Sequence, residues 1–485
     1  MLWSARPALR VKGRGYDVRV TLRRLPIGTL VFAICLLLPI VALAGDEQVL
    51  RYFTAEEIAR HDEYVRPLYS LWAIKQVWWL LFTLVFLLLQ LNRKLKVRSD
   101  RLAARLAGPL GKLGALRRVG GVLTKLWGDA TWGGAMVFVA AYLAIITLID
   151  LPTDFYFGWV RERQHGLSVE TFGRWSWDST KGFVISVATF STLAFGLYGL
   201  ARRRRNWWLL LGAPCAVLLL GAGLLDPYRV QVYRDYEPLP DGPAHEAILR
   251  TLEKAGVEHE GVFQLKMRDT TRRVNAFIAG QGPTRRIVVW DTFIAAMTPG
   301  EVANAVGHEL GHLRDRSPGR LVFASLCLVP YLWFIAVALR RLGRRGRLGF
   351  DGDRDVASLP AVLLLVWCVT TALNPIGGAY GRYLEHRADR YALELLEQPE
   401  SFRSMMVKLA SLNMADLHPP AWVVLLLASH PPTIERIERA EQFAREKGIA
   451  MAEPMPELFR APEPKQRAAE TKRAEPTTFE PAPPR

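Results

Sequence analysis

Residues 308–312 read His-Glu-Leu-Gly-His, and this stretch decides which fold we predict for the soluble part of the chain. In a helix, residues four apart lie on one face, so His308 and His312 can bind one zinc ion together. Glu309 then lies beside the open position of the metal, where it can take a proton from a water molecule whose pKa zinc lowers to about 7. The pattern predicts a catalytic zinc helix rather than a helix that carries these letters by chance.

The residues around this stretch predict a well-formed helix. Residues 298–301, Thr-Pro-Gly-Glu, form a capping box with proline at the first helical position. An apolar stripe follows, made of Val302, Ala305, Val306 and Leu310. We expect the helix to run to about Arg314 and to break near residues 317–319, Ser-Pro-Gly, so both histidines lie where helical spacing holds.

A site with two histidines needs a third ligand, and a second helix expected from about Tyr380 supplies a candidate. Glu385 and Asp389 are four residues apart, so they share one face of this helix. Glu385 can complete a His-His-Glu set, and Asp389 can accept the outer N–H of a ligand histidine and fix its tautomer. His386 points to a different face and is expected at the surface. The alternative is an ordinary charged helix whose acids pair with its own arginines, Arg382, Arg387 and Arg390.

The two motifs together resemble the M48 metallopeptidases, and their Ste24 branch, the CAAX prenyl proteases, more than the smaller HtpX-like branch. Other matching stretches are Asn-Ala-Phe at 275–277, Ile-Val-Val-Trp-Asp-Thr at 287–292, Ser-His-Pro-Pro at 429–432, and Arg436. These stretches cover the C-terminal half, whereas the N-terminal half is similar only in its hydrophobic layout. Residues 269–273, Asp-Thr-Thr-Arg-Arg, depart from the family, which tends to have Ser and His there.

The resemblance implies a role for each matching residue. It makes His308, His312 and Glu385 the ligands of one zinc ion per chain and Glu309 the general base. It also implies that His430 stabilises the transition state and that Asn275 and Arg436 bind substrate. The alternatives are a helix-start residue ahead of two prolines for His430, and an ordinary sheet edge for Asn275.

Seven apolar blocks predict membrane spans in a chain of 485 residues that is half hydrophobic yet carries a formal charge of +17. Each block is close to the roughly 20 residues that cross a bilayer. The expected spans are Ile27–Ala44, Leu71–Leu91, Trp132–Leu151, Gly182–Leu200, Trp207–Leu225, Leu321–Leu339 and Leu359–Gly377. The second block contains Lys75, so a buried core helix is its alternative. A cleaved signal peptide is the alternative for the first block, and we favour retention because the leader before it is long.

Basic residues set the expected orientation through the positive-inside rule. The N-terminus, the segment after the second span, Arg202–Arg205 and Arg340–Arg347 are basic, whereas the segments after the first and third spans are acidic or mixed. This alternation places residues 226–319 and everything after Gly377 outside, which is the periplasm for a bacterial inner membrane. Most of the positive charge is therefore topological, and no nucleic-acid partner is needed to explain it.

We therefore predict a mainly α integral membrane protein of about seven transmembrane helices with an α+β zincin-type catalytic domain. The resemblance implies that the helices ring a chamber. The expected parts are a basic N-terminus (1–26), five spans (27–225), a catalytic segment (226–320), a two-span hairpin (321–378), a second catalytic segment (379–450) and a disordered tail (451–485). The soluble part is expected to hold helices at 246–254, 401–412 and 434–447 and strands at 263–267, 274–279 and 287–290.

The predicted function is that of an integral-membrane zinc metalloendopeptidase acting on peptide or protein substrates. The resembling proteases cleave prenylated CAAX proteins, but a periplasmic site favours membrane-protein quality control. One alternative is a membrane chaperone or scaffold with a structural zinc, although structural sites usually close all four positions with Cys or His. Another alternative is a transporter, although the spans hold few midplane charges. No oligomer is implied, and no disulfide is predicted because the cysteines fall within expected spans, at Cys35, Cys215, Cys327 and Cys368.

Overall fold

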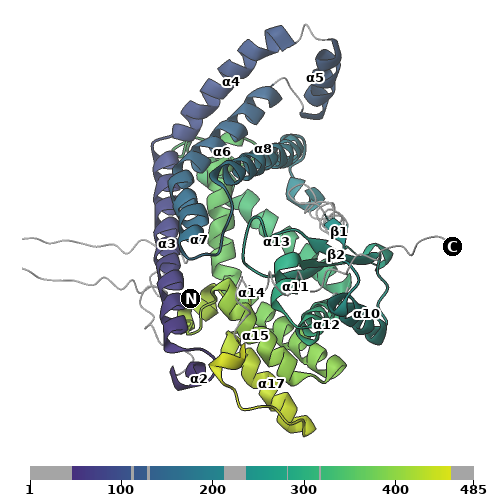
Figure 1. The fold of residues 1–485 in the computed structure, drawn as a ribbon. Coiled ribbons are helices and arrows are strands. Elements are labelled where there is room, and N and C mark those ends of the chain that lie inside the picture. Colours follow the sequence, from purple (N-terminus) through teal and green to yellow (C-terminus); the bar gives the residue numbers. More distant parts are fainter. Residues whose placement is uncertain are drawn as a thin grey trace, which may run out of the picture.

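The computed structural model describes residues 46–110, 114–127, 131–211, 236–280, 282–315 and 318–459. Long helices form one part of the molecule, and a domain with a small sheet packs beside their lower half (Figure 1). The elements of the helical part are α2 (Asp46–Leu50), α3 (Ala55–Leu88), α4 (Leu91–Leu110), α5 (Gly114–Trp127), α6 (Trp132–Phe155), a π-helical turn (Tyr156–Val160), α7 (Arg161–Gln164), α8 (Phe172–Arg203), α13 (Pro318–Gly343), a 3-10 turn (Val356–Ser358) and α14 (Leu359–Leu396). The elements of the catalytic domain are β1 (Tyr236–Pro238), α10 (Pro243–Ala255), β2 (Gly261–Leu265), β3 (Ala276–Ala279), a 3-10 turn (Gly282–Thr284), β4 (Arg286–Trp290), α11 (Asp291–Ala296), α12 (Pro299–Asp315), α15 (Pro399–Asn413), α16 (Ala421–Leu426), α17 (Thr433–Lys447) and a last 3-10 turn (Pro456–Phe459).

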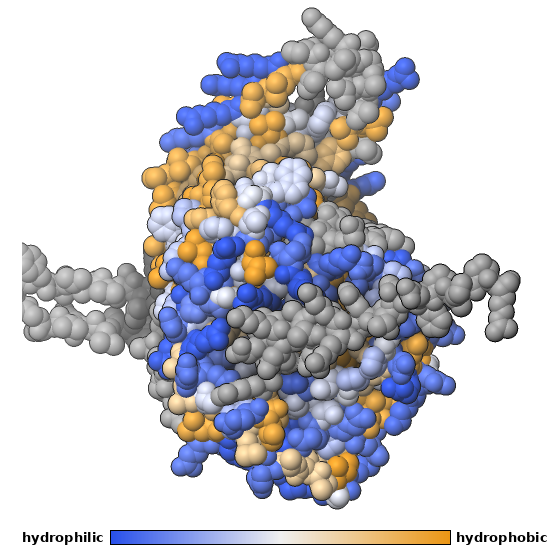
Figure 2. All heavy atoms as spheres, in the orientation of Figure 1, coloured by the Kyte–Doolittle hydropathy of each residue, from blue (hydrophilic) through white to orange (hydrophobic). Residues whose placement is uncertain are grey.

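Four helical stretches of the described residues are long and apolar enough to cross a membrane. They are Ala55–Leu88, Trp132–Gln164, Phe172–Arg203 and Val356–Leu396. Each contains most or all of one expected span, and only 17–33% of each apolar window is buried inside the protein. Figure 2 shows hydrophobic side chains over these upper helices and mainly hydrophilic ones over the lower body.

The other expected spans are less well described. Leu321–Leu339 lies in α13, which is not among the four stretches above. Ile27–Ala44 and most of Trp207–Leu225 lie outside the described residues, as do Cys35 and Cys215. Cys327 and Cys368 are free thiols. The core-helix alternative for Leu71–Leu91 is not favoured, because only 17% of the apolar window of α3 is buried and Lys75 pairs with Asp154 of α6 at 2.5 Å.

A four-stranded sheet in the order β1-β2-β4-β3 underlies the catalytic domain. β2 and β4 are parallel, whereas β1 and β3 pair antiparallel with their neighbours, so β3 is an edge strand. The three expected strands are present within a few residues of their expected bounds, and β1 is an additional strand. The three expected helices of the domain are present as α10, α15 and α17, and the zinc helix is present as α12.

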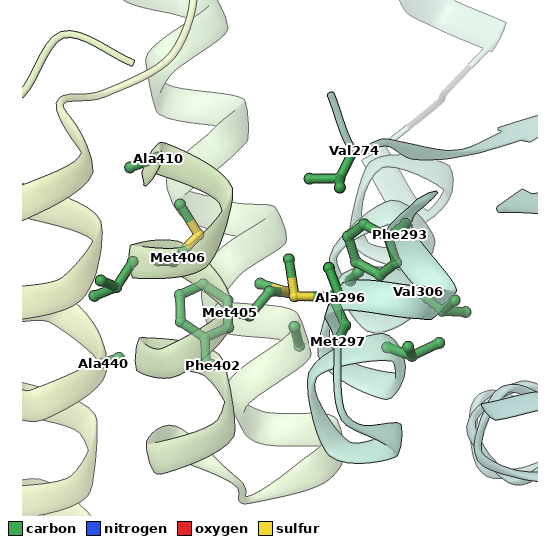
Figure 3. Close-up of a cluster of buried hydrophobic side chains, with 14 of the residues drawn as sticks. Val274, Phe293, Ala296, Met297, Val306, Phe402, Met405, Met406, Ala410 and Ala440 are labelled. Atoms are coloured by element: carbon green, nitrogen blue, oxygen red, sulfur yellow. The ribbon is translucent and has the colours of Figure 1, made fainter. Parts of the chain in front are cut away.

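The two catalytic segments share one hydrophobic core (Figure 3). In the sequence, α13 and most of α14 lie between them. Phe293, Met297 and Val306 from the first segment meet Phe402 and Met405 from the second. All five side chains are nearly or fully buried. Burying an apolar side chain of this size contributes about 1.5–3 kcal/mol, so this core holds α12 and α14 in a fixed relation.

Two segments differ from expectation: the basic segment after the second span and the segment that begins at Met451. The basic segment after the second span was expected as a loop, but it forms helices α4 and α5, which project from the upper end of the molecule (Figure 1). The disordered tail was expected from Met451, but residues 451–459 are ordered. Phe459 is buried against Tyr52, and Arg403 donates to the carbonyl of Ala452, so this segment packs onto the catalytic domain, with Phe459 in its hydrophobic core.

Candidate metal centre

His308 and His312 project from one face of α12 toward the same point. Their Nε2 atoms are 3.1 Å apart, and their rings stand nearly perpendicular. The expected capping box is present, because Glu301 accepts from the N–H of Thr298 at 2.7 Å while Thr298 Oγ1 accepts from the N–H of Glu301. The helix then runs unbroken to Asp315, so the spacing of the two histidines is that of a regular helix.

Glu385 of α14 completes the group. Its carboxylate lies 3.4 Å from His308 Nε2 and 3.2 Å from His312 Nε2. One donor atom from each of these three residues lies within 4.8 Å of the others. The alternative of a helix with locally paired charges fits Glu385 poorly, since Arg387 pairs with Asp315 and Arg390 with Glu394 and Glu446.

The donor set fits a zinc ion. Two ring nitrogens and a carboxylate are ordinary zinc ligands, and a tetrahedral ion with Zn–N bonds of about 2.05 Å holds two nitrogens about 3.3 Å apart. Glu385 Oε2 is buried and accepts no hydrogen bond among the described residues. The nearest nitrogens to this oxygen are His308 Nε2 at 3.4 Å and an Arg436 nitrogen at 3.7 Å, both long contacts, so a bound metal ion would offset part of the cost of its burial. Two histidines and one glutamate also leave a fourth tetrahedral position open.

Asp389 and Arg436 contact His308 on the side of its Nδ1 atom. Asp389 is almost completely buried, and its Oδ1 lies 2.8 Å from His308 Nδ1, which leaves Nε2 for the metal. Arg436 donates to both oxygens of Asp389, at 2.8 and 2.5 Å. Burial alone would lower the pKa of His308, but the neighbouring carboxylates of Asp389 and Glu385 raise it to about 9. The carboxylates that favour a proton on this ring also favour a metal cation at the cluster.

The position of Arg436 differs from the substrate contact expected for it. Its side chain is about one-tenth exposed and lies beneath His308, with its guanidinium on Asp389. It also reaches within 3.7 Å of Glu385. A role in holding the ligands fits this position better than contact with a peptide.

The three remaining expected residues are Glu309, His430 and Asn275, and His430 has a contact with the cluster. Glu309 follows His308 on α12 and is half-buried. His430 lies in the loop between α16 and α17, with Nε2 at 3.4 Å from Glu385 Oε1 and Nδ1 at 2.9 Å from Ser429 Oγ. Asn275 is exposed and directly precedes edge strand β3, and its carbonyl accepts from the N–H of Trp290 at 3.0 Å. His386 faces elsewhere, since it contacts Glu435 of α17 at 3.2 Å.

Two arginines that sequence reasoning did not assign to the site hold its surroundings. Arg382 contacts the loop before His430, and Arg273 ties the strand that begins after Asn275 to the helical part. Arg273 donates to Glu162 and to Tyr64, and its neighbour Val274 pairs with the side-chain amide of Asn413. No local sequence signal distinguishes these arginines from the many basic residues of the chain, because their partners lie far away in sequence.

Two family models match the chain. Residues 238–444 match the model described as peptidase family M48. Residues 46–231 match the model described as the CAAX prenyl protease N-terminal region, with five membrane helices. The first match contains the whole metal centre, and the second contains the helices that precede it.

Individual relatives agree with the family models. The uncharacterized metalloprotease YhfN of Bacillus subtilis is 31% identical over 315 residues, which are 63% of this chain and 72% of the relative. The CAAX prenyl protease 1 homolog of Oryza sativa is 24% identical over 319 residues, 63% of this chain and 73% of the relative. The crystal structure of S. mikatae Ste24p has a TM-score of 0.69 at 17% identity and covers 85% of this chain and 94% of its own, so the two share a fold.

Proposed function

Because the chain belongs to peptidase family M48 and is a membrane metalloendopeptidase of the Ste24-like kind, we propose that His308, His312 and Glu385 bind one zinc ion and that Glu309 is the general base. The observation that carries this proposal is the convergence of three donor atoms within 4.8 Å beside a buried oxygen of Glu385 that lacks a hydrogen bond. The family itself implies a metal, and the donor set favours zinc.

Each residue around the cluster has a separate role in the proposed peptide hydrolysis. A zinc ion held there would polarise the scissile carbonyl and lower the pKa of a water molecule to about 7. Glu309 accepts the proton of the attacking water and passes it to the leaving amine. His430 donates a hydrogen bond to the carbonyl oxygen as negative charge develops on it. Asp389 keeps the outer proton of His308 in place, and Arg436 holds Asp389.

Edge strand β3 is the proposed site for an extended substrate. Its partner β4 covers only one side of it, so its other edge can pair with a peptide backbone. Asn275 stands exposed at the start of this strand, and its side chain is one further polar contact for the peptide. An edge that recognises backbone rather than side chains suits a protease with broad sequence tolerance.

We assign the substrate class as extended or unfolded segments of membrane-associated proteins, in a quality-control role. Seven helices ringing a chamber would admit such chains and exclude folded ones. The fold similarity to Ste24p supports this arrangement, in which the four described candidate spans would take part. Several relatives carry the name CAAX prenyl protease, but a periplasmic site in a bacterial inner membrane would have no access to prenylated cytosolic proteins.

The distribution of charge over the structure supports the periplasmic orientation. The segment before the acidic start of α3 and helix α7 both contact the catalytic domain, since Tyr52 donates to Glu441 of α17 and Glu162 of α7 pairs with Arg273. The basic segments meet at the other end, where Arg93 pairs with Asp351. Positively charged ends face the cytoplasm. An alkaline phosphatase fusion after Asp226 is therefore expected to be active and one after Gly346 inactive, and the reverse result would contradict this orientation.

Glu309→Gln tests the enzyme against its alternatives. Purified wild-type protein is expected to hold one zinc ion and to cleave an unfolded protein such as casein. Glu309→Gln should keep the zinc but lose roughly 10²–10⁴-fold in kcat, the usual contribution of a general base. Glu394→Gln, an exposed carboxylate on α14, is the control and should match wild type. Equal cleavage by wild type and Glu309→Gln would remove the assigned base, and zinc without any cleavage would favour a chaperone with a structural zinc.

A further inference from the structure

One face of α14 carries both the third candidate ligand and the surface on which the loop before His430 rests. Asn374, Gly378, Gly381 and Glu385 recur at helical spacing, so they lie along one stripe of this helix. The first three contact the end of α16 and residues 427–430, which we call the His430 loop. The ligand and the loop are therefore held by the same stripe.

Polar side chains of α14 hold the carbonyls at the end of α16. Arg382 Nη1 donates to the carbonyl oxygens of Val424 and Ala428, each at 2.7 Å. The Asn374 amide donates to the carbonyl of Leu426. The last carbonyls of a helix have no donor within the helix, and a cation there is favourable. These contacts fix where α16 ends and where the His430 loop begins.

Two glycines let the loop backbone approach α14. A Cβ added to Gly378 would come 3.1 Å from the carbonyl oxygen of Ala428, and one added to Gly381 would come 3.0 Å from that of Ser429. Both distances are tighter than ordinary van der Waals contact. Gly377, beside them on the helix, faces open space, with nothing within 4 Å of an added Cβ. The close approach is therefore specific to the stripe that faces the loop.

We propose that Arg382, Gly378 and Gly381 are positioning residues that hold His430 in its catalytic place. The His430 side chain is 63% exposed, so little packing of its own directs it, and its direction depends on the backbone that carries it. That backbone places Nε2 3.4 Å from Glu385 Oε1. The inference rests on the proposed function, since it explains how the proposed oxyanion donor is held. A shift of about 1 Å in such a group costs about 100-fold in rate.

Steady-state kinetics on the full-length protein test the role. His430→Ala should lower kcat about 100-fold, as loss of an oxyanion donor does. Arg382→Gln should lower kcat about tenfold or more, with KM and zinc content unchanged. Arg382→Lys should recover most of the activity, because a single nitrogen of Arg382 serves both carbonyls. Gly381→Ala should lower kcat several-fold, and the matched control Gly377→Ala should not.

A double-mutant cycle separates positioning of His430 from a general structural role. If Arg382 acts through His430, Arg382→Gln lowers kcat less than about twofold in a His430→Ala background. A loss as large in that background as in wild type would overturn the inference. So would full activity of Arg382→Gln and Gly381→Ala.

A measurement without turnover tests the positioning of His430 separately from peptide cleavage. In protein loaded with cobalt and labelled with ¹⁵N-histidine, the His430 ring resonance should be paramagnetically shifted, and His430→Ala identifies it. Arg382→Gln and Gly381→Ala should reduce that shift, whereas Gly377→Ala should preserve it. A shift unchanged by all three substitutions would overturn the positioning role even in an active enzyme. A protein that shows the expected shifts but cleaves nothing would contradict only the proposed function.

Discussion

Gly311 of α12 lies so close to Ala388 of α14 that a Cβ added to the glycine would come 2.6 Å from the Ala388 Cα. This contact lies between the two helices that carry the candidate ligands. It brings Glu385 to His308 and His312, because Gly311 precedes one histidine and Ala388 follows the glutamate by three residues. The glycine in the His-Glu-Leu-Gly-His stretch is thus a helix-crossing position as well as a spacer between ligands.

Gly311→Ala is expected to separate the two helices and weaken the metal centre. Its Cβ would meet backbone rather than a flexible side chain, so the helices must move apart. Overpacking of this kind costs about 1–3 kcal/mol of folding stability. We expect a lower zinc content and a loss of most of the peptidase activity. Elemental analysis and thermal unfolding in detergent measure both effects.

Gly307→Ala is the matched control for this substitution. Gly307 lies one turn earlier on α12, and its added Cβ would come 3.3 Å from side-chain atoms of Ala392 and Leu396. Leu396 can adjust, so the effect on zinc content should be clearly smaller than for Gly311→Ala. Equal effects of the two substitutions would contradict a special role for the Gly311–Ala388 crossing.

Asp389→Asn is expected to weaken zinc binding without removing a ligand. Outer partners of ligand histidines typically contribute 10–100-fold to metal affinity, and Asp389 is the partner of His308. The substitution also breaks the buried pair with Arg436, which then has only the longer contact with Glu385 at 3.7 Å, and breaking such a pair costs about 3–5 kcal/mol. Competition with a chelating dye measures the affinity, and thermal unfolding measures the stability.

The double variant Asp389→Asn/Arg436→Met distinguishes these two effects. Removing the unpaired charge should restore much of the lost stability but none of the lost zinc affinity, because the histidine still lacks a charged acceptor. Recovery of zinc affinity in the double variant would show that Asp389 acts through the fold rather than through His308.

Glu301→Gln is expected to destabilise the protein without touching its chemistry. Glu301 is 2% exposed, caps α12 through the N–H of Thr298, and pairs with Lys408 of α15 at 2.8 Å. Breaking one partner of a buried pair costs about 3–5 kcal/mol because the other charge stays buried. The melting temperature should fall while kcat below the transition stays near the wild-type value. A fall in kcat with no change in melting temperature would contradict this assignment.

The helices of the metal centre and their candidate ligands can be predicted from the sequence, because short local motifs specify them. The capping box at 298–301 predicts the start of α12, and the helix ends at Asp315, one residue after the expected Arg314, whereas Pro318 and Gly319 of the expected break begin α13. Glu385 and Asp389 share a face at helical spacing, and the structure brings that face to the two histidines. The expected helices and strands of the catalytic domain are also present, since their apolar patterns match their periods.

The remainder depends on contacts between residues far apart in the chain. β1 is three residues long and includes Pro238, so it has no strand pattern of its own and exists because it pairs with β2. Arg436 was expected at the substrate, but its charge is satisfied by Asp389, 47 residues away. The crossing at Gly311 cannot be read from a glycine alone, because it requires knowing that Ala388 lies opposite.

Arg273→Gln is expected to impair substrate binding more than the chemical step. Arg273 pairs with Glu162 at 3.0 Å and donates to Tyr64 of α3 at 2.6 Å and to the carbonyl of Asn413 at 2.7 Å. These contacts tie the start of the proposed substrate-binding edge to the membrane helices. Losing them should let Asn275 and β3 shift while the ligands stay in place. We expect KM for an unfolded substrate to rise about tenfold, with kcat and zinc content nearly unchanged, as for loss of uniform binding.

Arg272→Gln provides the comparison, since it removes the same charge from the neighbouring, exposed position. The backbone N–H of Arg272, which donates to the carbonyl of Leu167, is kept in this variant. KM should therefore stay near the wild-type value, and an equal rise in both variants would indicate a nonspecific electrostatic effect. Glu162→Gln should reproduce part of the Arg273→Gln effect, because it removes the charged partner but leaves the contacts with Tyr64 and Asn413. If Arg273→Gln instead lowers kcat and zinc content together, the arginine supports the metal centre and not the edge of the sheet.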